Sequence, residues 1–284
     1  MVRSSGFEDR RWTENGSAVI ALFVGRYWSR PAREASQPAP DESEPPMIRR
    51  TRSDDGILTI TIDNTTSANA LRAGMLESLI DAFDAASKNF ELRGVLLTSA
   101  GSKGFSAGMD TTQFDHSNPT RAFETISRLG QVCEAIKDCE LPVAVAIRGY
   151  CIGGAAEIAA AADFRVGSTG SWYSMPEVRI GIPSVLESVN LHRLMGWTKA
   201  TEFILTGNRF SAEDMDKCGF LNAIVDDSAV EDRALGYLYD TMKASREVIA
   251  QQKRLHRTWK NSFEREALED SKKEFALSFA RRNG

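Results

Sequence analysis

The sequence predicts an α/β protein whose second half is mainly helical. Over residues 57–166, short β-branched or apolar runs alternate with segments of helical periodicity. Strands and helices in this alternation indicate βαβ units, which build parallel sheets. Beyond Glu187 the pattern is helical apart from one short run at 222–225.

The individual elements follow from apolar spacing and from the residues that bound each run. Short apolar or β-branched runs predict strands at 57–62, 94–98, 143–147, 164–166 and 222–225. Apolar residues three and four apart predict helices at 73–89, 125–138, 154–162, 228–243, 246–260 and 263–280. The run Ser211–Asp214 has the form of a helix-capping signal and marks a further helix start.

Composition divides the chain into an extension, a core and a helical region. Residues 1–46 contain five prolines between positions 31 and 46, interspersed with Ser, Ala and acidic residues. Such a segment buries too little apolar surface to offset the entropy of ordering, so we expect a disordered N-terminal extension. The α/β core is expected at 47–226 and a C-terminal helical region at 227–284.

Charge and cysteine usage exclude several classes of protein. The net charge is -4, which leaves no broad basic surface for nucleic acid. The four cysteines form no CxxC pair and the three histidines are far apart, so no metal site is expected. We interpret the cysteines as reduced and the protein as intracellular. The basic run at 253–257 is interpreted as a solvated helix face.

We recognise no targeting signal or membrane helix near either end of the sequence. The apolar stretch at 18–24 is far shorter than the ~20 residues that a membrane helix needs. Glu8, Asp9 and Glu14 precede it and argue against a secretory or mitochondrial signal. The last residues, 281–284, do not match a peroxisomal signal. We therefore expect the cytoplasm, with mitochondria and peroxisomes left open.

A glycine pair precedes the short helix predicted at 154–162. The run Gly149–Glu157 follows a buried strand and opens this helix, whose N-terminus presents free N–H groups and a partial positive charge. Gly153 and Gly154 would leave those N–H groups uncovered, which suits a developing oxyanion, although two glycines can equally serve packing. The G-x-G-x-x-G fingerprint of dinucleotide binding does not fit.

Two glutamates are candidates for acid–base chemistry. Glu157 lies inside the apolar run GAAEIAAAA, where burial would raise its pKa toward neutrality. A solvated or ion-paired glutamate is the alternative. Glu177 follows Pro176, which holds Met175 extended, so that its carboxylate can be aimed rigidly. Taken alone it is an ordinary loop acid.

A third motif, the loop at 103–110, carries small residues at 106–108 that let a ligand approach the backbone. Together the motifs resemble the crotonase (enoyl-CoA hydratase/isomerase) family in order and spacing over about 55–284. The matching segments are Ser67–Leu71, Phe105–Asp110, Gly149–Glu157, Met175–Glu177, Leu205–Gly207 and Ser211–Ala212. The resemblance implies a crotonase-like fold of repeated ββα units with a C-terminal helical trimerisation region, assembled as trimers or hexamers.

The resemblance also implies the chemistry, which is hydration of a 2-enoyl-CoA thioester. By motif position Glu157 would be mainly the base and Glu177 the acid. The N–H groups of Met109 and Gly154 would form an oxyanion hole. No cofactor is implied, because coenzyme A arrives with the substrate. The expected substrate- and CoA-binding residues are Ala68, Ala70, Lys103, Asp110, Thr111 and Thr112, with Lys103 opposite a phosphate and the two alanines around the adenine.

One loop departs from the family pattern. Hydratases commonly continue P-G-A-G-G, whereas this chain has Ser184–Ser188, SVLES, after Pro183. That loop borders the acyl pocket in the family, so the acyl group stays open. Glu187 is either a third pocket carboxylate or, as we expect, a residue that faces solvent or an arginine.

Three rival functions remain. A Δ3,Δ2-enoyl-CoA isomerase would need one carboxylate, and retention of both Glu157 and Glu177 favours hydration. Another acyl-CoA reaction of the family in a specialised pathway is also open. The third rival is a non-catalytic relative that binds a partner such as RNA, which the acidic charge and the two intact acids disfavour.

Overall fold

The computed structural model describes residues 47–114 and 119–262. The chain divides into two units, Met1–Pro45 and Pro46–Gly284, and all described residues lie in the second. The expected extension 1–46 and the expected helix 263–280 lie outside the described residues. No helix within the described ranges is long and apolar enough to cross a membrane.

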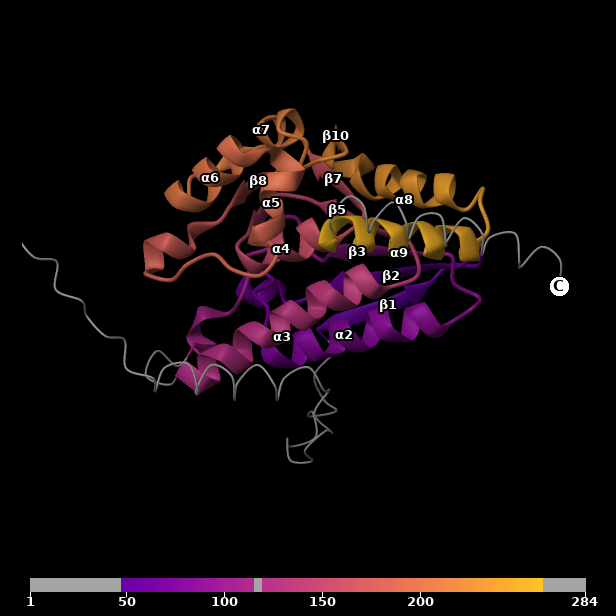
Figure 1. Cartoon of the computed structure of the whole chain (residues 1–284), viewed down its shortest axis with the longest axis horizontal. Helices are drawn as coiled ribbons and strands as arrows, with labels where there is room; N and C mark the ends of the chain where they lie inside the picture. Colours follow the sequence, from indigo (N-terminus) through magenta and orange to yellow (C-terminus); the bar gives the residue numbers. More distant parts are fainter. Residues whose placement is uncertain (1–46, 115–118, 263–284) are drawn as a thin grey trace, which may run out of the picture. The chain divides into compact units, whose positions relative to one another are not determined.

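A six-stranded sheet forms the centre of the described unit (Figure 1). In spatial order its strands are β1 Ile48–Arg52, β2 Ile57–Ile62, β3 Gly94–Ser99, β5 Val143–Ile147, β7 Phe164–Ser168 and β10 Ala223–Val225. β1 pairs with β2 in the antiparallel sense and all the other neighbours are parallel. The parallel sheet is as predicted. The arginine-rich strand β1 was missed because its sequence, IRRTR, lacks apolar alternation.

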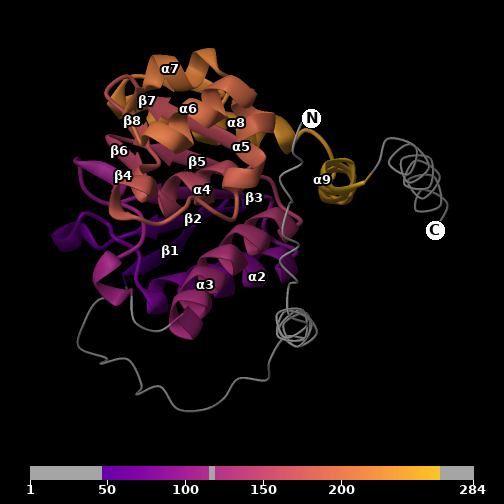
Figure 2. The ribbon, with the colours of Figure 1, turned by 60° about the vertical axis from the view of Figure 1, so that its left-hand side comes forward.

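Both faces of this sheet are covered by helices (Figures 1 and 2). Helices α2 (Ala73–Lys88) and α3 (Pro119–Asp138) cover one face, where their apolar side chains pack with Val95 and Leu97 of β3. Helix α8 (Val230–Thr241) covers the other face and packs on Leu96. Because successive side chains of a strand alternate between faces, a strand covered on both sides has a continuous apolar sequence.

A second, smaller sheet carries the loops that will form the site. Its strands are β4 Gly104–Ser106, β6 Tyr150–Ile152, β8 Trp172–Ser174 and β9 Phe210–Ser211, of which only β9 is antiparallel to its neighbour. Strands of two or three residues are too short for a periodic pattern, so none of them was predicted. With them the chain follows a repeated strand–strand–helix order, as the expected ββα units require.

The other α-helices of the described ranges lie between later strands of the two sheets or, for α9, after the last strand. They are α4 Gly154–Ala161, α5 Ser188–Met195, α6 Trp197–Thr206, α7 Ala212–Lys217 and α9 Arg246–Asn261. Helix α7 begins with the capping box predicted from sequence, in which Ser211 and Asp214 bond reciprocally.

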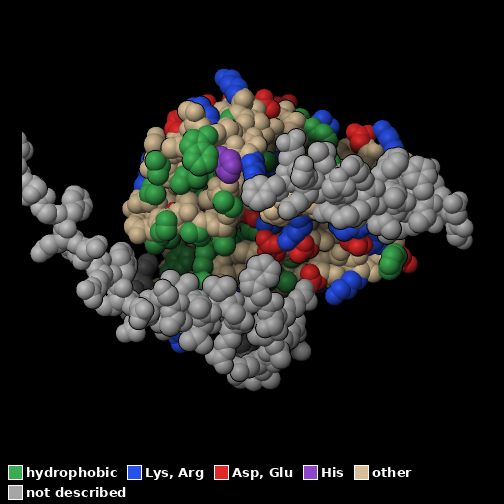
Figure 3. Space-filling model, viewed as in Figure 1, with side chains coloured by type: hydrophobic (Ala, Val, Ile, Leu, Met, Phe, Trp, Pro, Cys, Tyr) green, Lys and Arg blue, Asp and Glu red, His purple; other side chains and the backbone are tan. Residues whose placement is uncertain are grey.

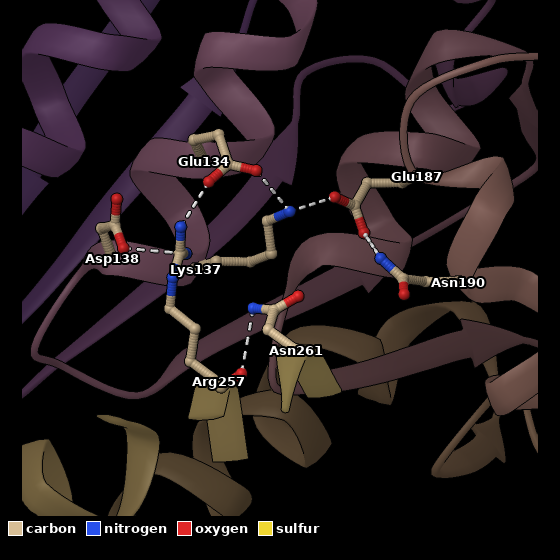
Figure 4. A network of polar contacts seen from close by, with 7 residues as sticks. All are labelled: Glu134, Lys137, Asp138, Glu187, Asn190, Arg257 and Asn261. Carbon is tan, nitrogen blue, oxygen red and sulfur yellow. Dashed lines mark hydrogen bonds and ion pairs between the residues drawn. The ribbon is translucent and has the colours of Figure 1, made fainter. Parts of the chain in front are cut away.

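The interpretation of the basic run of α9 as a solvated helix face is only partly right, because Arg254 and His256 are exposed whereas Lys253 and Arg257 are partly buried. Instead of facing solvent, Lys253 is mostly buried and donates to Leu141 O (2.8 Å) and to Asp163 Oδ2 (2.6 Å). Arg257 forms an ion pair with Asp138 of α3, with Nη1 and Oδ1 2.8 Å apart (Figure 4). These basic side chains therefore attach α9 to its own core.

Candidate active site

A pocket that is partly open to solvent lies where the loop after β4, the start of α4 and the turn after β8 meet. That turn is the 3-10 helix η3 (Pro176–Ile180). Glu157, Glu177, Met109 and Gly154 all line the pocket. The fold thus brings together residues from three motifs that are far apart in the chain.

The loop after β4 and the start of α4 are in backbone contact. A Cβ added to Gly108 would lie 2.5 Å from Ile152 O and 3.3 Å from Gly154 N. Gly108 also has a φ of +83°, in the region that favours glycine. Only glycine therefore allows the two segments to approach this closely.

The backbone N–H groups of Met109 and Gly154, which both line the pocket, have no hydrogen-bond partner among the described residues. Leu71 N donates to Gly108 O (2.8 Å) and Asp110 N donates to Leu71 O (2.9 Å), so the N–H of Met109 between them points away from this pairing. Across the described part of the chain, neither Met109 N–H nor Gly154 N–H donates a hydrogen bond within the protein. An unpaired N–H group at a helix start, such as that of Gly154, suits an anionic oxygen.

Glu157 lies on the first turn of α4 and is only 4% exposed. Burial raises the pKa of Glu157 to about 8, and the charges of Glu177 and Glu187 add to the rise. Ser188 Oγ donates to Glu157 Oε1 (3.0 Å) and opposes the rise. The burial expected from the apolar run is present, and the carboxyl titrates near neutral pH.

Glu177 lines the same pocket from a different element, the first turn of η3. Ser184 Oγ donates to its Oε2 over 3.2 Å. Burial raises the pKa of Glu177 as well. Two carboxyl groups with raised pKa values in one pocket suit proton transfer at neutral pH.

The mouth of the pocket is apolar. Ile180 and Val185 both line it, yet they are 55% and 39% exposed. In Figure 3 apolar side chains gather on the left of the view, where Figure 1 places α6 and the segment before α5. The apolar lining also includes Ile126, Leu129, Ile152, Ile182 and Pro183.

The expected CoA-binding residues before β4 lie beside the loop but do not line the pocket. Ala107 N donates to Ala68 O (3.1 Å), which places the segment of Ala68 and Ala70 along the loop after β4. Lys103 is exposed in the turn that leads into β4. Their contact with coenzyme A stays a prediction.

The residues after Met109 form a polar turn. Asp110 caps the 3-10 helix η2 (Thr111–Gln113) by accepting a hydrogen bond from Thr112 N (3.1 Å). Arg72 Nε lies 3.1 Å from the Asp110 carboxylate, and the hydrogen bonds from Thr112 and the ion pair lower the pKa of Asp110. Thr111 lines the pocket, whereas Asp110 and Thr112 do not.

Sequence reasoning missed two features around Glu157. The hydrogen bond from Ser188 joins residues 31 positions apart, and nothing in the local sequence signals it. The expectation that Glu187 faces solvent or an arginine is wrong, because its buried carboxylate pairs with Lys137. Glu187 does not line the pocket either. Removing a carboxylate from water costs free energy, and an ion pair with a cation such as Lys137 offsets part of that cost.

Comparison with known proteins agrees with this geometry. The family model for enoyl-CoA hydratase/isomerase matches residues 52–282. An enoyl-CoA hydratase structure from Mycobacterium smegmatis is 24% identical, with a TM-score of 0.78 over 82% of this chain and 91% of that one. One from Thermoplasma volcanium is 26% identical, with a TM-score of 0.76 over 82% and 92%.

Pseudomonas aeruginosa DspI is 25% identical, with a TM-score of 0.79 over 85% of this chain and 92% of that one. These similarities confirm the predicted crotonase-like fold. The family match spans most of the sequence, and its residues include the whole pocket. The chain therefore belongs to the enoyl-CoA hydratase/isomerase family.

Proposed function

We propose that the protein is an enoyl-CoA hydratase that adds water to a 2-enoyl-CoA thioester. The main support for this proposal is that Glu157 and Glu177 line the same pocket as Met109 and Gly154, whose N–H groups are unpaired in the described structure. Membership of a family whose enzymes generally act on CoA thioesters supports the substrate class.

The two N–H groups would bind the thioester oxygen. Attack of water at Cβ moves negative charge onto that oxygen and gives an enolate. Donors already in position stabilise this charge, and losing one such donor typically costs about 2.7–4 kcal/mol of transition-state stabilisation. Because Met109 contributes its backbone, substitution of its side chain need not abolish activity.

The two carboxyl groups would handle the protons. One accepts a proton from the attacking water and the other delivers a proton to Cα. The resemblance assigns Glu157 as base and Glu177 as acid. With a pKa of about 8, Glu157 must lose its own proton before it can act as a base. Such a pair titrates as a unit, so a pH profile reports on the pair.

The acyl group is proposed to be a hydrocarbon chain. Glu157 and Glu177 are the only ionisable side chains that line the described pocket, and most of the other lining residues are apolar. A carboxylate or ammonium on the acyl group would lose its hydration there without gaining an ionic partner.

A panel of 2-enoyl-CoA and 3-enoyl-CoA esters tests the proposal. Hydration removes the conjugated-thioester absorbance of the 2-enoyl esters, whereas isomerisation of the 3-enoyl esters creates it. We expect loss of absorbance with a 2-enoyl ester. If absorbance rises with 3-enoyl esters and falls with none of the 2-enoyl esters, the protein is an isomerase instead. If the absorbance of no ester changes, a non-catalytic relative is favoured.

We also propose that the protein assembles as a trimer or a hexamer, as the resemblance implies. Trp197 and Leu205 of α6 are 72% and 68% exposed, and large apolar side chains left in water favour an interface. Sedimentation velocity would show a monomer if this is wrong.

A further inference from the structure

A buried ion pair stands behind the wall of the pocket. The side chains of Lys137 (α3) and Glu187 are 19% and 6% exposed and bond directly to each other (Figure 4). Asn190 Nδ2 donates to the second oxygen of Glu187 (2.9 Å), and Lys137 Nζ also lies 2.7 Å from Glu134 Oε1. Burying an ion pair costs desolvation free energy unless hydrogen bonds satisfy its remaining polar atoms. We therefore infer that this pair serves to fix the position of the segments that carry it.

The residue before Glu187 has a strained backbone. Leu186 has a φ of +50°, a left-handed conformation that a non-glycine residue keeps only when its surroundings hold it there. A Cβ added to Gly130 of α3 would lie 3.1 Å from Leu186 Cδ2, so the Leu186 side chain rests on this helix. Helix α3 thus holds both Leu186 and Glu187.

The residues on either side of this anchored pair reach the site. Val185 lines the pocket, and Ser188, the first residue of α5, donates to Glu157 Oε1. Ser188 N donates to Val185 O (2.9 Å), which closes the segment into a turn. A shift of this turn would move the pocket wall and the partner of Glu157 together.

We propose that Lys137 is a positioning residue of the proposed active site. By binding Glu187, it holds the strained segment Val185–Ser188 so that Ser188 stays bonded to Glu157. The proposal rests on the proposed function, because it assumes that Glu157 takes part in proton transfer.

Loss of Lys137 would change the pKa of Glu157, and the charged groups around Glu157 determine the direction of the change. Glu177 of η3 and Glu187 at the start of α5 face it, together with the buried Cys133 thiol of α3. Without Lys137, Glu187 would be an unpaired negative charge, and Ser188 would be free to leave. Both changes raise the pKa of Glu157, because one adds repulsion and the other removes a hydrogen bond to the carboxylate.

The test is a double-mutant cycle of Lys137→Met and Ser188→Ala. In each single variant we expect kcat to fall roughly 10- to 100-fold with little change in KM, the size of effect that a misplaced catalytic group produces. The rising limb of the kcat–pH profile, which reports on the coupled Glu157–Glu177 pair, should move to higher pH in both. Because Lys137 acts through Ser188, Lys137→Met should have a much smaller effect in the Ser188→Ala background. Equal effects in both backgrounds would overturn the proposal.

Arg257→Met is the matched control. It removes the ion pairs of Arg257 with Glu134 and Asp138 on the same helix but leaves the bond between Lys137 and Glu187 in place. We expect a lower melting temperature with parental kcat. If Lys137→Met fails to fold, Lys137→Met with Glu187→Gln removes both charges, and parental kcat in that protein would also overturn the proposal.

An infrared titration of the Glu157 carboxyl, assigned by its loss in Glu157→Gln, separates this inference from the proposed function. The measurement needs no substrate turnover. We expect the pKa of Glu157 to rise in Lys137→Met and in Ser188→Ala, and an unchanged value in Lys137→Met would overturn the positioning role. If the parent protein hydrates no ester, the proposed function fails, while the titration still decides whether Lys137 positions the environment of Glu157.

Discussion

The carboxylate of Glu177 rests on the backbone of Gly153, where an added Cβ would lie 2.6 Å from Oε1. Gly153 caps α4 with a φ of +54°, and the next residue, Gly154, presents the unpaired N–H. One proposed acid and one proposed oxyanion donor are therefore positioned by adjacent residues of the backbone.

Gly153→Ala should displace Glu177. The new methyl group would meet its carboxylate, and the positive φ would strain the helix start. We expect kcat for hydration to fall by roughly tenfold or more, the scale of a misplaced catalytic group. Gly170→Ala is the control, because nothing lies within 4 Å of its added Cβ. Equal activity of the two variants would contradict the contact.

Glu177→Gln should slow hydration by at least ~100-fold, because general acid–base groups typically contribute 10²–10⁴. Stability should change little, because the side chain remains partly exposed in a turn. Steady-state kinetics on an ester that the parent hydrates measures the effect, with exposed Glu213→Gln as control. Near-parental turnover of Glu177→Gln would remove it from the mechanism.

The pH dependence of hydration tests the role of Glu157 within the coupled Glu157–Glu177 pair. If Glu157 is the base, kcat/KM rises as pH rises through about 8, where the free carboxyl loses its proton. If it is the acid, kcat/KM falls through the same range. The assignment by resemblance predicts the rise, and a fall would exchange the roles of Glu157 and Glu177.

Stability should also depend on pH through Glu157. Burial raises its folded pKa from the ordinary value of 4.5 to about 8, so the folded state holds the proton more tightly than the unfolded state. Its contribution to stability is therefore lost progressively as pH rises from 4.5 to 8. Glu157→Gln should not lose stability in this way, because glutamine does not ionise. Melting curves should show its advantage over the parent growing across that window, and a constant difference would contradict the raised pKa.

Gly154→Val should lose both activity and acyl-CoA affinity, and Gly154→Ala should be milder. The added Cβ would lie 2.8 Å from Leu129 Cδ2 and 3.3 Å from Met109 Cγ. The Leu129 side-chain end can move to accept one methyl group, whereas β-branching fills the space above the N–H. Calorimetry measures the affinity for acyl-CoA and the melting curve measures stability, so the two together separate an effect on binding from an effect on packing. Intact affinity in folded Gly154→Val protein would exclude Gly154 from the oxyanion hole.

Local patterns predicted the long elements closely. Helix α2 was expected at 73–89 and spans Ala73–Lys88, and the strand expected at 57–62 is β2. In both, the hydrophobic period repeats over enough residues to identify the element. The small sheet was missed because strands such as β4, only three residues long, show no period.

The sequence by itself determined the family resemblance and the candidate acids, because Glu157 and Glu177 lie in short motifs whose chemistry is local. Tertiary structure alone decided how deeply Glu157 is buried, how far its pKa rises, and that Ser188 and the Lys137–Glu187 pair lie around it. These contacts join α3, α4 and α5. A local pattern records which face of a helix is apolar, but the side chain that meets it from a distant helix is set only when the helices pack.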